Sequence, residues 1–327
     1  MELVAVDIGG THARFTIATV DDTGAISLDD PVTLHTDDHA SFQTAWEDYK
    51  ARKGGNLPSD VALAIAGPIT EEVIRFTNNP WIIRPALVNE KMGTKRNVIV
   101  NDFEAVAHAA AQLSDEHFIH LTGPDIPIAK TGTISVIGPG TGLGVAHFHR
   151  DPDGSYHVQA TEGGHVHFAP VDSIEDAILA RLRKTHSRVS VERVVSGPGI
   201  AEIYQTLAAM EGRAVAEVDD ITIWTKGTSG EDSLAAAAVD RFCLALGSVA
   251  GDIALAHGGF GGVVIAGGLG YRIRETLKTS GFAQRFTFKG RYQQLMASIP
   301  VKIVTHPQPG LLGAAAAFAK EYGSKEQ

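Results

Sequence analysis

The sequence predicts an α/β fold made of two similar lobes around a largely parallel core of strands. Strand-like apolar runs alternate with helical patterns along most of the chain, which is typical of parallel sheets covered by helices. A glycine-rich hairpin pattern occurs once in each half of the sequence. A chain of 327 residues with 44% apolar residues is an ordinary globular protein, long enough for two unequal lobes.

The hairpin pattern occupies residues 3–20 and again residues 133–150. Each copy has an apolar strand, a glycine-threonine turn, a second apolar strand and a closing Asp/Gly turn. An ungapped alignment superimposes Gly10 on Gly140, Thr11 on Thr141 and Gly24 on Gly154. Because both turns keep the same register in this alignment, we predict a duplicated lobe.

Between and after the hairpins, strands and helices alternate. Buried-strand runs cover residues 61–66, 98–100, 263–266 and 301–305. Helical patterns cover residues 41–52, 103–113, 174–184, 190–195, 199–210, 234–257 and 311–322, with a further helix after Gly268.

Composition and charge exclude several classes of protein. The net charge of −10 offers no broad basic surface, so no nucleic-acid partner is expected. Cys243 is the only cysteine, which excludes an intrachain disulfide and a cysteine-built zinc site. Residues 1–7 enter a strand without a basic leader segment, and the longest apolar region, 248–270, is interrupted by Asp252, His257 and glycines. We therefore expect a cytoplasmic protein with no membrane span.

The first glycine turn lies in the segment Asp7-Ile8-Gly9-Gly10-Thr11. Glycine lets a phosphate approach the backbone closely, and threonine adds a hydroxyl donor. The carboxylate of Asp7, at the end of a strand, is placed to hold magnesium directly or through water. The alternative is a tight structural hairpin with a surface aspartate. The twin turn at 138–144 weighs against that alternative, because two glycine turns can grip a triphosphate from both sides.

Two commoner phosphate-binding motifs are absent from the sequence. The Rossmann pattern starting at Gly138 fails because Leu143 occupies the position of the third glycine. None of the Lys-Thr pairs, at 130–131, 184–185 and 278–279, follows a glycine in the frame of a Walker A motif. The phosphates must therefore be bound in another way.

Seven motif segments follow one another along the chain. Three are Asp7-Ile8-Gly9-Gly10-Thr11-His12-Ala13-Arg14, Gly138-Pro139-Gly140-Thr141-Gly142-Leu143-Gly144 and Val264-Ile265-Ala266-Gly267-Gly268. The others occupy residues 99–106, 162–166, 192–199 and 309–314. The first three resemble the two phosphate motifs and the adenosine motif of the actin/hexokinase/Hsp70 superfamily. The others resemble the sugar-site segments and the closing helix of bacterial glucokinases, in the same order along nearly the whole chain.

The resemblance implies a two-lobed actin-like ATPase fold, of the ribonuclease H-like kind, with an interlobe cleft. Residues 1–110 with 306–327 would form the small lobe, and residues 111–305 the large lobe. The implied reaction moves a phosphoryl group from ATP, with magnesium near Asp7, to the 6-hydroxyl of glucose. A homodimer is expected at the level of the family. The implied nucleotide-binding residues are Val6, Asp7, Ile8, Gly9, Gly10, Thr11, Gly138, Gly140, Thr141, Gly142, Gly267 and Gly268.

The pair Asn101-Asp102 ends the apolar run 98–100, where strands of open α/β sheets present polar groups to a ligand. A carboxylate there can accept the proton of an attacking sugar hydroxyl. Equally, Asp102 can cap a helix that begins at Phe103. The residues alone leave both roles open. The resemblance favours Asp102 as the general base and Asn101 as a sugar ligand.

The segment Glu162-Gly163-Gly164-His165-Val166-His167 admits a zinc site, but alternate strand positions separate Glu162 from His165 unless the glycines bend the chain. The resemblance instead implies that Glu162, His165 and Glu192 bind sugar hydroxyls. Without it, Glu192 is a first-turn carboxylate after the N-cap Ser190. His12 and His167 depart from the residues usual in the family, and neither is assigned to the chemistry.

Two other readings of the sequence are weaker. A sugar-responsive DNA-binding regulator needs a module ahead of Asp7 for which there is no room, and a zinc motif that one cysteine cannot supply. An actin- or Hsp70-like ATPase without a sugar substrate gives no reason for the Glu162, His165 and Glu192 set. The polar turn 77–81 is either a loop over the sugar or a surface turn ending on a core tryptophan, Trp81.

Overall fold

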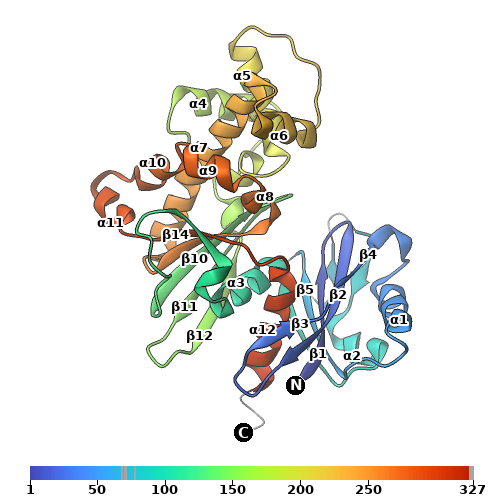
Figure 1. The fold of residues 1–327 in the computed structure, drawn as a ribbon. Coiled ribbons are helices and arrows are strands. Elements are labelled where there is room, and N and C mark those ends of the chain that lie inside the picture. Colours follow the sequence, from blue (N-terminus) through green and yellow to red (C-terminus); the bar gives the residue numbers. More distant parts are fainter. Residues whose placement is uncertain (68, 70–71, 77–78, 324–327) are drawn as a thin grey trace. The chain divides into compact units, whose positions relative to one another are not determined.

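The computed structural model describes residues 1–67, 69, 72–76 and 79–323 (Figure 1). The chain divides into two compact units. Unit 1 comprises Met1–Leu113 and His306–Gln327, and unit 2 comprises Ser114–Thr305. Each unit has its own central sheet and its own hydrophobic core.

Unit 1 is built on a sheet with the strand order β3-β2-β1-β5-β8, to which β4 adds by pairing with β2. β1 pairs antiparallel with β2 and parallel with β5, and β5 pairs parallel with β8. Every residue of β5 is buried, as expected of a central strand covered on both faces. The strands are β1 (Glu2–Ile8), β2 (His12–Val20), β3 (Ile26–Leu28), β4 (Val32–His35), β5 (Asp60–Ile65) and β8 (Arg96–Asn101), with a separate ribbon of β6 (Ile74–Arg75) and β7 (Ile82–Ile83).

Helices cover both faces of this sheet. Because side chains alternate along a strand, Val4 and Ile8 of β1 join the apolar cluster that includes α1, whereas Leu3 joins the cluster that includes α12. A Cβ at Gly313 of α12 would lie 1.6 Å from the carbonyl oxygen of Ala105 in α3, so only glycine permits this contact. The helices of unit 1 are α1 (Phe42–Arg52), α2 (Val88–Met92), α3 (Asp102–Gln112) and α12 (Pro309–Tyr322).

Unit 2 contains a second six-stranded sheet, with the order β12-β11-β10-β13-β14-β9. β10 pairs antiparallel with β11 and parallel with β13, and β13 pairs parallel with β14. The strands are β9 (Phe118–Thr122), β10 (Gly132–Pro139), β11 (Leu143–Arg150), β12 (Tyr156–Thr161), β13 (Gly262–Ile265) and β14 (Val301–Val304).

A long apolar helix, α7 (Ser233–His257), lies in the core of unit 2. Among the described residues it is the one helix long and apolar enough to cross a membrane, but 72% of its most apolar window is buried inside the protein. It therefore has the burial of a core helix, and Cys243 within it is fully buried. The other helices of the unit are α4 (Ser173–Leu182), α5 (Gly199–Met210), α6 (Asp220–Ser229), α8 (Gly267–Arg272), α9 (Arg274–Thr279), α10 (Phe282–Thr287) and α11 (Gln293–Ala297).

The two sheets share one strand order, with β1, β2, β3, β5 and β8 corresponding to β10, β11, β12, β13 and β14. The Asp/Gly turns match residue by residue. The N–H of Gly24 donates to the carbonyl of Asp21, and that of Gly154 to the carbonyl of Asp151, both at 3.0 Å. The predicted common register is therefore right for these turns.

The glycine-threonine turns differ by one residue. β1 and β2 pair up to Ile8 and Ala13, so four residues connect them, whereas β10 and β11 pair up to Pro139 and Leu143, with three residues between. The common register of the sequence alignment therefore does not extend to the strand pairing beside these turns. An ungapped alignment compares residue types, whereas pairing depends on how each turn closes its own hydrogen bond.

Most predicted elements agree with the structure to within a few residues. The predicted helix over 190–195 is wrong, since only Val191–Arg193 forms a short 3-10 turn. This segment instead pairs with a neighbouring loop, through the N–H of Val191 and the carbonyl of Val166 at 2.9 Å. The pattern also missed α6, whose isoleucines and threonines have modest helix propensity.

Candidate active site

The first glycine turn, between β1 and β2, is held through its carbonyl groups. Thr36 donates its N–H to the carbonyl of Thr11 at 3.0 Å and its hydroxyl to that of Gly10 at 2.8 Å. The side-chain amide of Asn79 donates to the carbonyl of Gly9 at 3.4 Å. Within the described part of the chain, the N–H groups of Gly10 and Thr11 have no acceptor. Free adjacent amides of this kind are suited to bind an anion.

Asp7 lies near the end of β1, beside this turn. Its carboxylate is paired with the guanidinium of Arg14 on β2, with 3.3 Å between Oδ2 and Nη1. Burial raises the pKa of Asp7, and the charge of Arg14 opposes that rise. The first turn of α12 lies against the carboxylate, since a Cβ at Gly310 would lie 2.9 Å from Oδ2. The absence of a side chain at Gly310 thus allows the first turn of α12 to lie this close to the carboxylate.

The second glycine turn, between β10 and β11, is held by the segment 192–197. The N–H of Gly197 donates to the carbonyl of Gly140 at 2.7 Å. The carboxylate of Glu192 accepts the N–H of Leu143 at 2.8 Å. Between these two contacts, the N–H groups of Thr141 and Gly142 have no acceptor among the described residues. Both glycine turns therefore present free amides.

The predicted adenosine segment adjoins this second turn. The N–H of Ala266 donates to the carbonyl of Ile137 on β10 at 2.8 Å. Gly267 has a φ of 84°, and a Cβ there would lie 3.3 Å from the carbonyl oxygen of Pro139. Gly268 has open space around it. Glycine is thus required at Gly267 by the backbone, and Gly268 leaves the start of α8 open.

Asn101, rather than Asp102, caps α3. The side-chain oxygen of Asn101 accepts the N–H groups of Phe103 at 2.9 Å and Glu104 at 3.2 Å, and its amide donates to the carbonyl of Gly67 at 3.1 Å. The helix therefore starts at Asp102, one residue earlier than predicted. Asp102 is half-buried at the first helical position, and its Oδ1 lies 2.8 Å from the N–H of Phe103. The capping role weighed for Asp102 belongs to its neighbour.

A short 3-10 turn, Gly163–His165, brings the side chains of Glu162 and His165 to the same side of the chain. Their side chains are exposed, and Oε2 of Glu162 lies 3.8 Å from Nε2 of His165. A Cβ at Gly164 would lie 2.2 Å from the carbonyl oxygen of Leu143, so the turn needs glycine there. In the described ranges, no group of three or more His, Cys, Asp or Glu residues converges as a metal site, which removes the support for zinc.

The loop that carries His165 pairs with the loop that carries Glu192. His167 forms an isolated antiparallel bridge with Ser190. Arg188 donates to the carbonyl of His165 and, from Nε, to Nε2 of His167 at 3.3 Å. His167 therefore orients an arginine that braces this loop. No sequence pattern pointed to Arg188, because its partners are determined by loop pairing.

The predicted loop 77–81 is described only in part, since Thr77 and Asn78 lie outside the described residues. Asn79 is buried, and its side-chain oxygen accepts the N–H of Trp81 at 2.9 Å. Trp81 is 1% exposed and donates its indole N–H to the carbonyl of His39 at 2.8 Å. Trp81 is thus a core residue, while Asn79 links the loop to the first glycine turn.

The sequence as a whole matches one group of known proteins. A family model described as glucokinase matches residues 3–321. The glucokinase of Zymomonas mobilis subsp. mobilis is 53% identical over 326 residues, covering 100% of each chain. The chain belongs to the glucokinase family.

Solved structures agree with this assignment. A crystal structure of a glucokinase from an Antarctic psychrotroph has a TM-score of 0.85 and 34% identity, covering 98% of this chain and 99% of that one. A ROK family glucokinase from Streptomyces griseus, in complex with glucose and AMPPNP, has a TM-score of 0.63 and 17% identity, covering 98% and 100%. These neighbours have the actin-like ATPase fold, so the predicted α/β class is confirmed. The assignment as a glucokinase-family enzyme is confirmed by the family model and by the relative of 53% identity.

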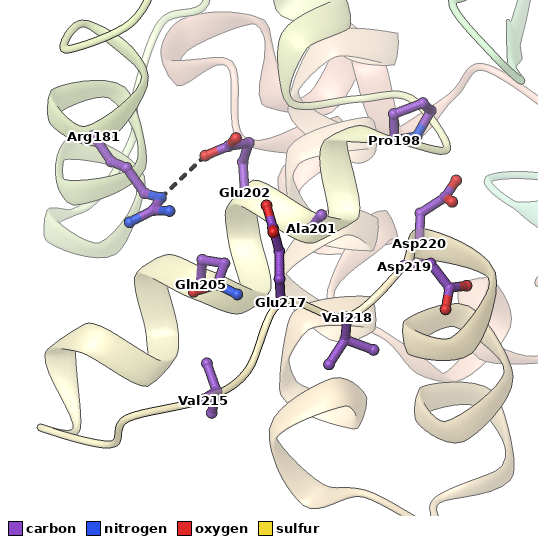
Figure 2. A pocket seen from close by; sticks show the side chains of 10 residues that line it. All are labelled: Arg181, Pro198, Ala201, Glu202, Gln205, Val215, Glu217, Val218, Asp219 and Asp220. Atoms are coloured by element: carbon purple, nitrogen blue, oxygen red, sulfur yellow. Dashed lines mark hydrogen bonds and ion pairs between the residues drawn. The ribbon is translucent and has the colours of Figure 1, made fainter.

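This glucokinase-family chain also has an open groove of about 730 Å³ in unit 2, lined by α4, α5 and the loop that leads to α6 (Figure 2). Glu202 on its wall pairs with Arg181 at 3.0 Å, and Asp219 accepts the N–H of Thr222 at 2.8 Å as the cap of α6. None of the predicted nucleotide or sugar residues lines this groove. Two of its charged side chains therefore have structural partners within the fold.

Proposed function

We propose that this glucokinase-family enzyme transfers the γ-phosphoryl group of ATP to the 6-hydroxyl of glucose. The observation that carries the proposal is the pair of glycine turns with free amides, one in each unit. Each turn is held by its carbonyl groups or by an adjacent acidic side chain, so its amides are preorganised for phosphate oxygens. Unit 1 would act as the small lobe, approximately residues 1–110 with 306–327, and unit 2 as the large lobe, residues 111–305.

The nucleotide would be held by backbone groups of both turns and by the start of α8. In this proposal its phosphates meet the amides of Gly10, Thr11, Thr141 and Gly142, and its adenosine lies against Gly267 and Gly268. Val6, Ile8, Gly9, Gly138 and Gly140 complete the strands and turns that present these groups. The complex of the Streptomyces griseus relative with AMPPNP supports a nucleotide substrate for this fold.

Magnesium fits the residues around Asp7. A magnesium ion is usually held by one or two carboxylates together with phosphate and water oxygens, rather than by a cage of protein ligands. Asp7 provides one carboxylate beside the first glycine turn, with space left by Gly310. Asp7 would hold the ion directly or through water. When bound, magnesium would neutralise charge on the phosphates of ATP.

Asp102 would act as the general base. Its position at the first residue of α3 favours the ionised form, because the helix N-terminus stabilises a negative charge. In the reaction, the 6-hydroxyl oxygen of glucose forms a bond to the γ-phosphorus while the bond to the bridging oxygen of ADP breaks. The hydroxyl proton passes to the carboxylate of Asp102. Positioning and charge neutralisation supply most of the remaining catalysis.

The sugar would be bound by Asn101, Glu162, His165 and Glu192. Carboxylates and imidazoles hydrogen-bond several hydroxyls at once, and a site of this kind discriminates against analogues that lack a hydroxyl. Two features support the set. Glu162 and His165 share one turn, and the loop of Glu192 is paired with that turn. The interlobe cleft, a homodimer and a cytoplasmic location stay predictions.

The test is an ATP-consumption assay with magnesium and glucose, coupled to detection of glucose 6-phosphate. We expect glucose-dependent turnover in the wild type and little turnover without a sugar. A chain that consumes no ATP with glucose or any other hexose would contradict the proposal. Stabilisation of the protein by glucose alone would separate a sugar kinase from an ATPase that has no sugar site.

A further inference from the structure

The segment 192–197 contacts the second glycine turn on both of its sides. On one side the Glu192 carboxylate accepts the N–H of Leu143 at 2.8 Å. On the other side the N–H of Gly197 donates to the carbonyl of Gly140 at 2.7 Å. The two residues between these contacts, 141 and 142, are those whose amides have no acceptor within the described chain. The direction of these amides thus depends on the segment that brackets them.

This segment is itself firmly anchored in unit 2. Val191 and Val194 on either side of the acidic residue are buried in the apolar core, at 4% and 0% exposure. The N–H of Val191 donates to the carbonyl of Val166 at 2.9 Å. At the other end, the indole of Trp224 donates to the carbonyl of Gly197 at 2.9 Å. Glu192 is therefore a fixed acceptor rather than a mobile surface side chain.

The contact between Glu192 and the turn leaves no room for a side chain. A Cβ at Gly142 would lie 2.4 Å from Oε2 of Glu192 and 3.1 Å from its Cδ. The φ of Gly142 lies outside the left-handed region, so its backbone accepts alanine without strain. Alanine at 142 would thus act by pushing the carboxylate away. The same oxygen, Oε2, makes the bond to Leu143.

We propose that Glu192 is a positioning residue for the nucleotide, because its carboxylate orients the amides of Thr141 and Gly142 toward a phosphate. This inference rests on the proposed function, in which Glu192 also binds a sugar hydroxyl. Losing the acceptor leaves the N–H of Leu143 without a partner, and the turn relaxes to satisfy it. The role needs an acceptor oxygen at the right distance and does not need a negative charge, which by itself repels phosphate. One side chain therefore serves both substrates.

The experiment measures the binding of magnesium-AMPPNP to the full chain without glucose, by isothermal titration calorimetry. E192A should weaken binding about tenfold, equivalent to about 1.4 kcal/mol. E192D, which retains the charge but withdraws the carboxylate by one methylene, should show a similar loss. E192Q retains an acceptor oxygen at the same reach and should stay within about threefold of wild type. The matched control is E211A, since Glu211 is exposed and pairs with Arg213 at 3.3 Å.

A double-mutant comparison tests the contact directly. G142A should weaken nucleotide binding about tenfold in the wild-type background. In the E192A background the added methyl meets no carboxylate, so the further loss should disappear. As a control, circular dichroism and thermal unfolding are measured for each variant to establish that it is folded. If E192A does not fold, E192D takes its place in the comparison.

Two outcomes separate this inference from the proposed function. If E192A and E192D bind AMPPNP like wild type and only the KM for glucose rises, Glu192 is a sugar ligand alone and the positioning role is wrong. If wild type binds AMPPNP but phosphorylates no hexose, the proposed function fails. In that case the AMPPNP affinities of the Glu192 variants still decide whether Glu192 orients the amides of the second glycine turn.

Discussion

Replacing Asp102 with asparagine should separate catalysis from folding in this chain. Asp102 is the first residue of α3, but the helix is capped by Asn101, which accepts two N–H groups and completes a capping box with Glu104. Asparagine has nearly the shape of aspartate. Its amide oxygen can still accept the N–H of Phe103, which lies 2.8 Å from the present carboxylate. The D102N variant should therefore keep α3 and the end of β8 in place.

The magnitudes differ enough to be told apart. Loss of an ionised carboxylate from a first helical turn lowers the free energy of unfolding by about 0.3–1 kcal/mol. Loss of a general base lowers kcat by about 10²–10⁴-fold, or about 3–5 kcal/mol in activation free energy. N101A should instead act on stability. Removing the cap lowers the free energy of unfolding by about 0.5–2 kcal/mol, while Asp102 stays available as the base.

The assay compares kcat for glucose phosphorylation with the midpoint of denaturant unfolding in wild type, D102N and N101A. We expect D102N to lose nearly all turnover, to keep its affinity for glucose and AMPPNP, and to unfold close to wild type. If D102N is folded and retains more than about a tenth of wild-type kcat, Asp102 is not the base. A large loss of stability in D102N would show that Asn101 alone does not hold the helix.

The remaining predictions concern the metal, the helix contact and pH. D7N or removal of magnesium with EDTA should abolish turnover while glucose still stabilises the protein in thermal unfolding; full activity of D7N would contradict a metal role. G313A should lower the free energy of unfolding by about 2–4 kcal/mol, because the new methyl meets the carbonyl of Ala105. G323A, where an added Cβ meets no atom of the described residues within 4 Å, should change it by less than about 0.5 kcal/mol. Burial, aided by the charge of Lys320, lowers the pKa of His108 to about 4. Below pH 6.5 this histidine takes up a proton in the unfolded chain but stays neutral in the folded one, so the free energy of unfolding falls as the pH drops toward 4. The loss should be about 2 kcal/mol between pH 7 and 5, and the H108Q variant should lack this part of the pH dependence.

Local patterns in the sequence were enough to predict the class of fold. The apolar run 61–66 became β5, fully buried, and the glycine-threonine turns fell between antiparallel strands as expected. These features depend on neighbouring residues, whose periodicity and turn chemistry act over a few positions. Asn101 and Asp102 were likewise found because they follow a strand directly, although which of them caps the helix was not decided by residue type.

The supports of the candidate site could be seen only in the tertiary structure. Glu192 holds the N–H of Leu143 from 49 positions away, and Asn79 reaches Gly9 across 70 positions. Such contacts depend on how loops pair and on where glycine permits close approach, as at Gly310 beside Asp7. No local pattern encodes them.

The sequence by itself therefore determined the type of each element and the residues that present chemical groups. The tertiary structure decided the registers of the two glycine turns, which differ by one residue, and the partners that orient them. The physical reason is the range of the interactions. Strand and helix periodicity is a property of adjacent residues, whereas the direction of a free amide is set by whatever distant group holds the peptide beside it.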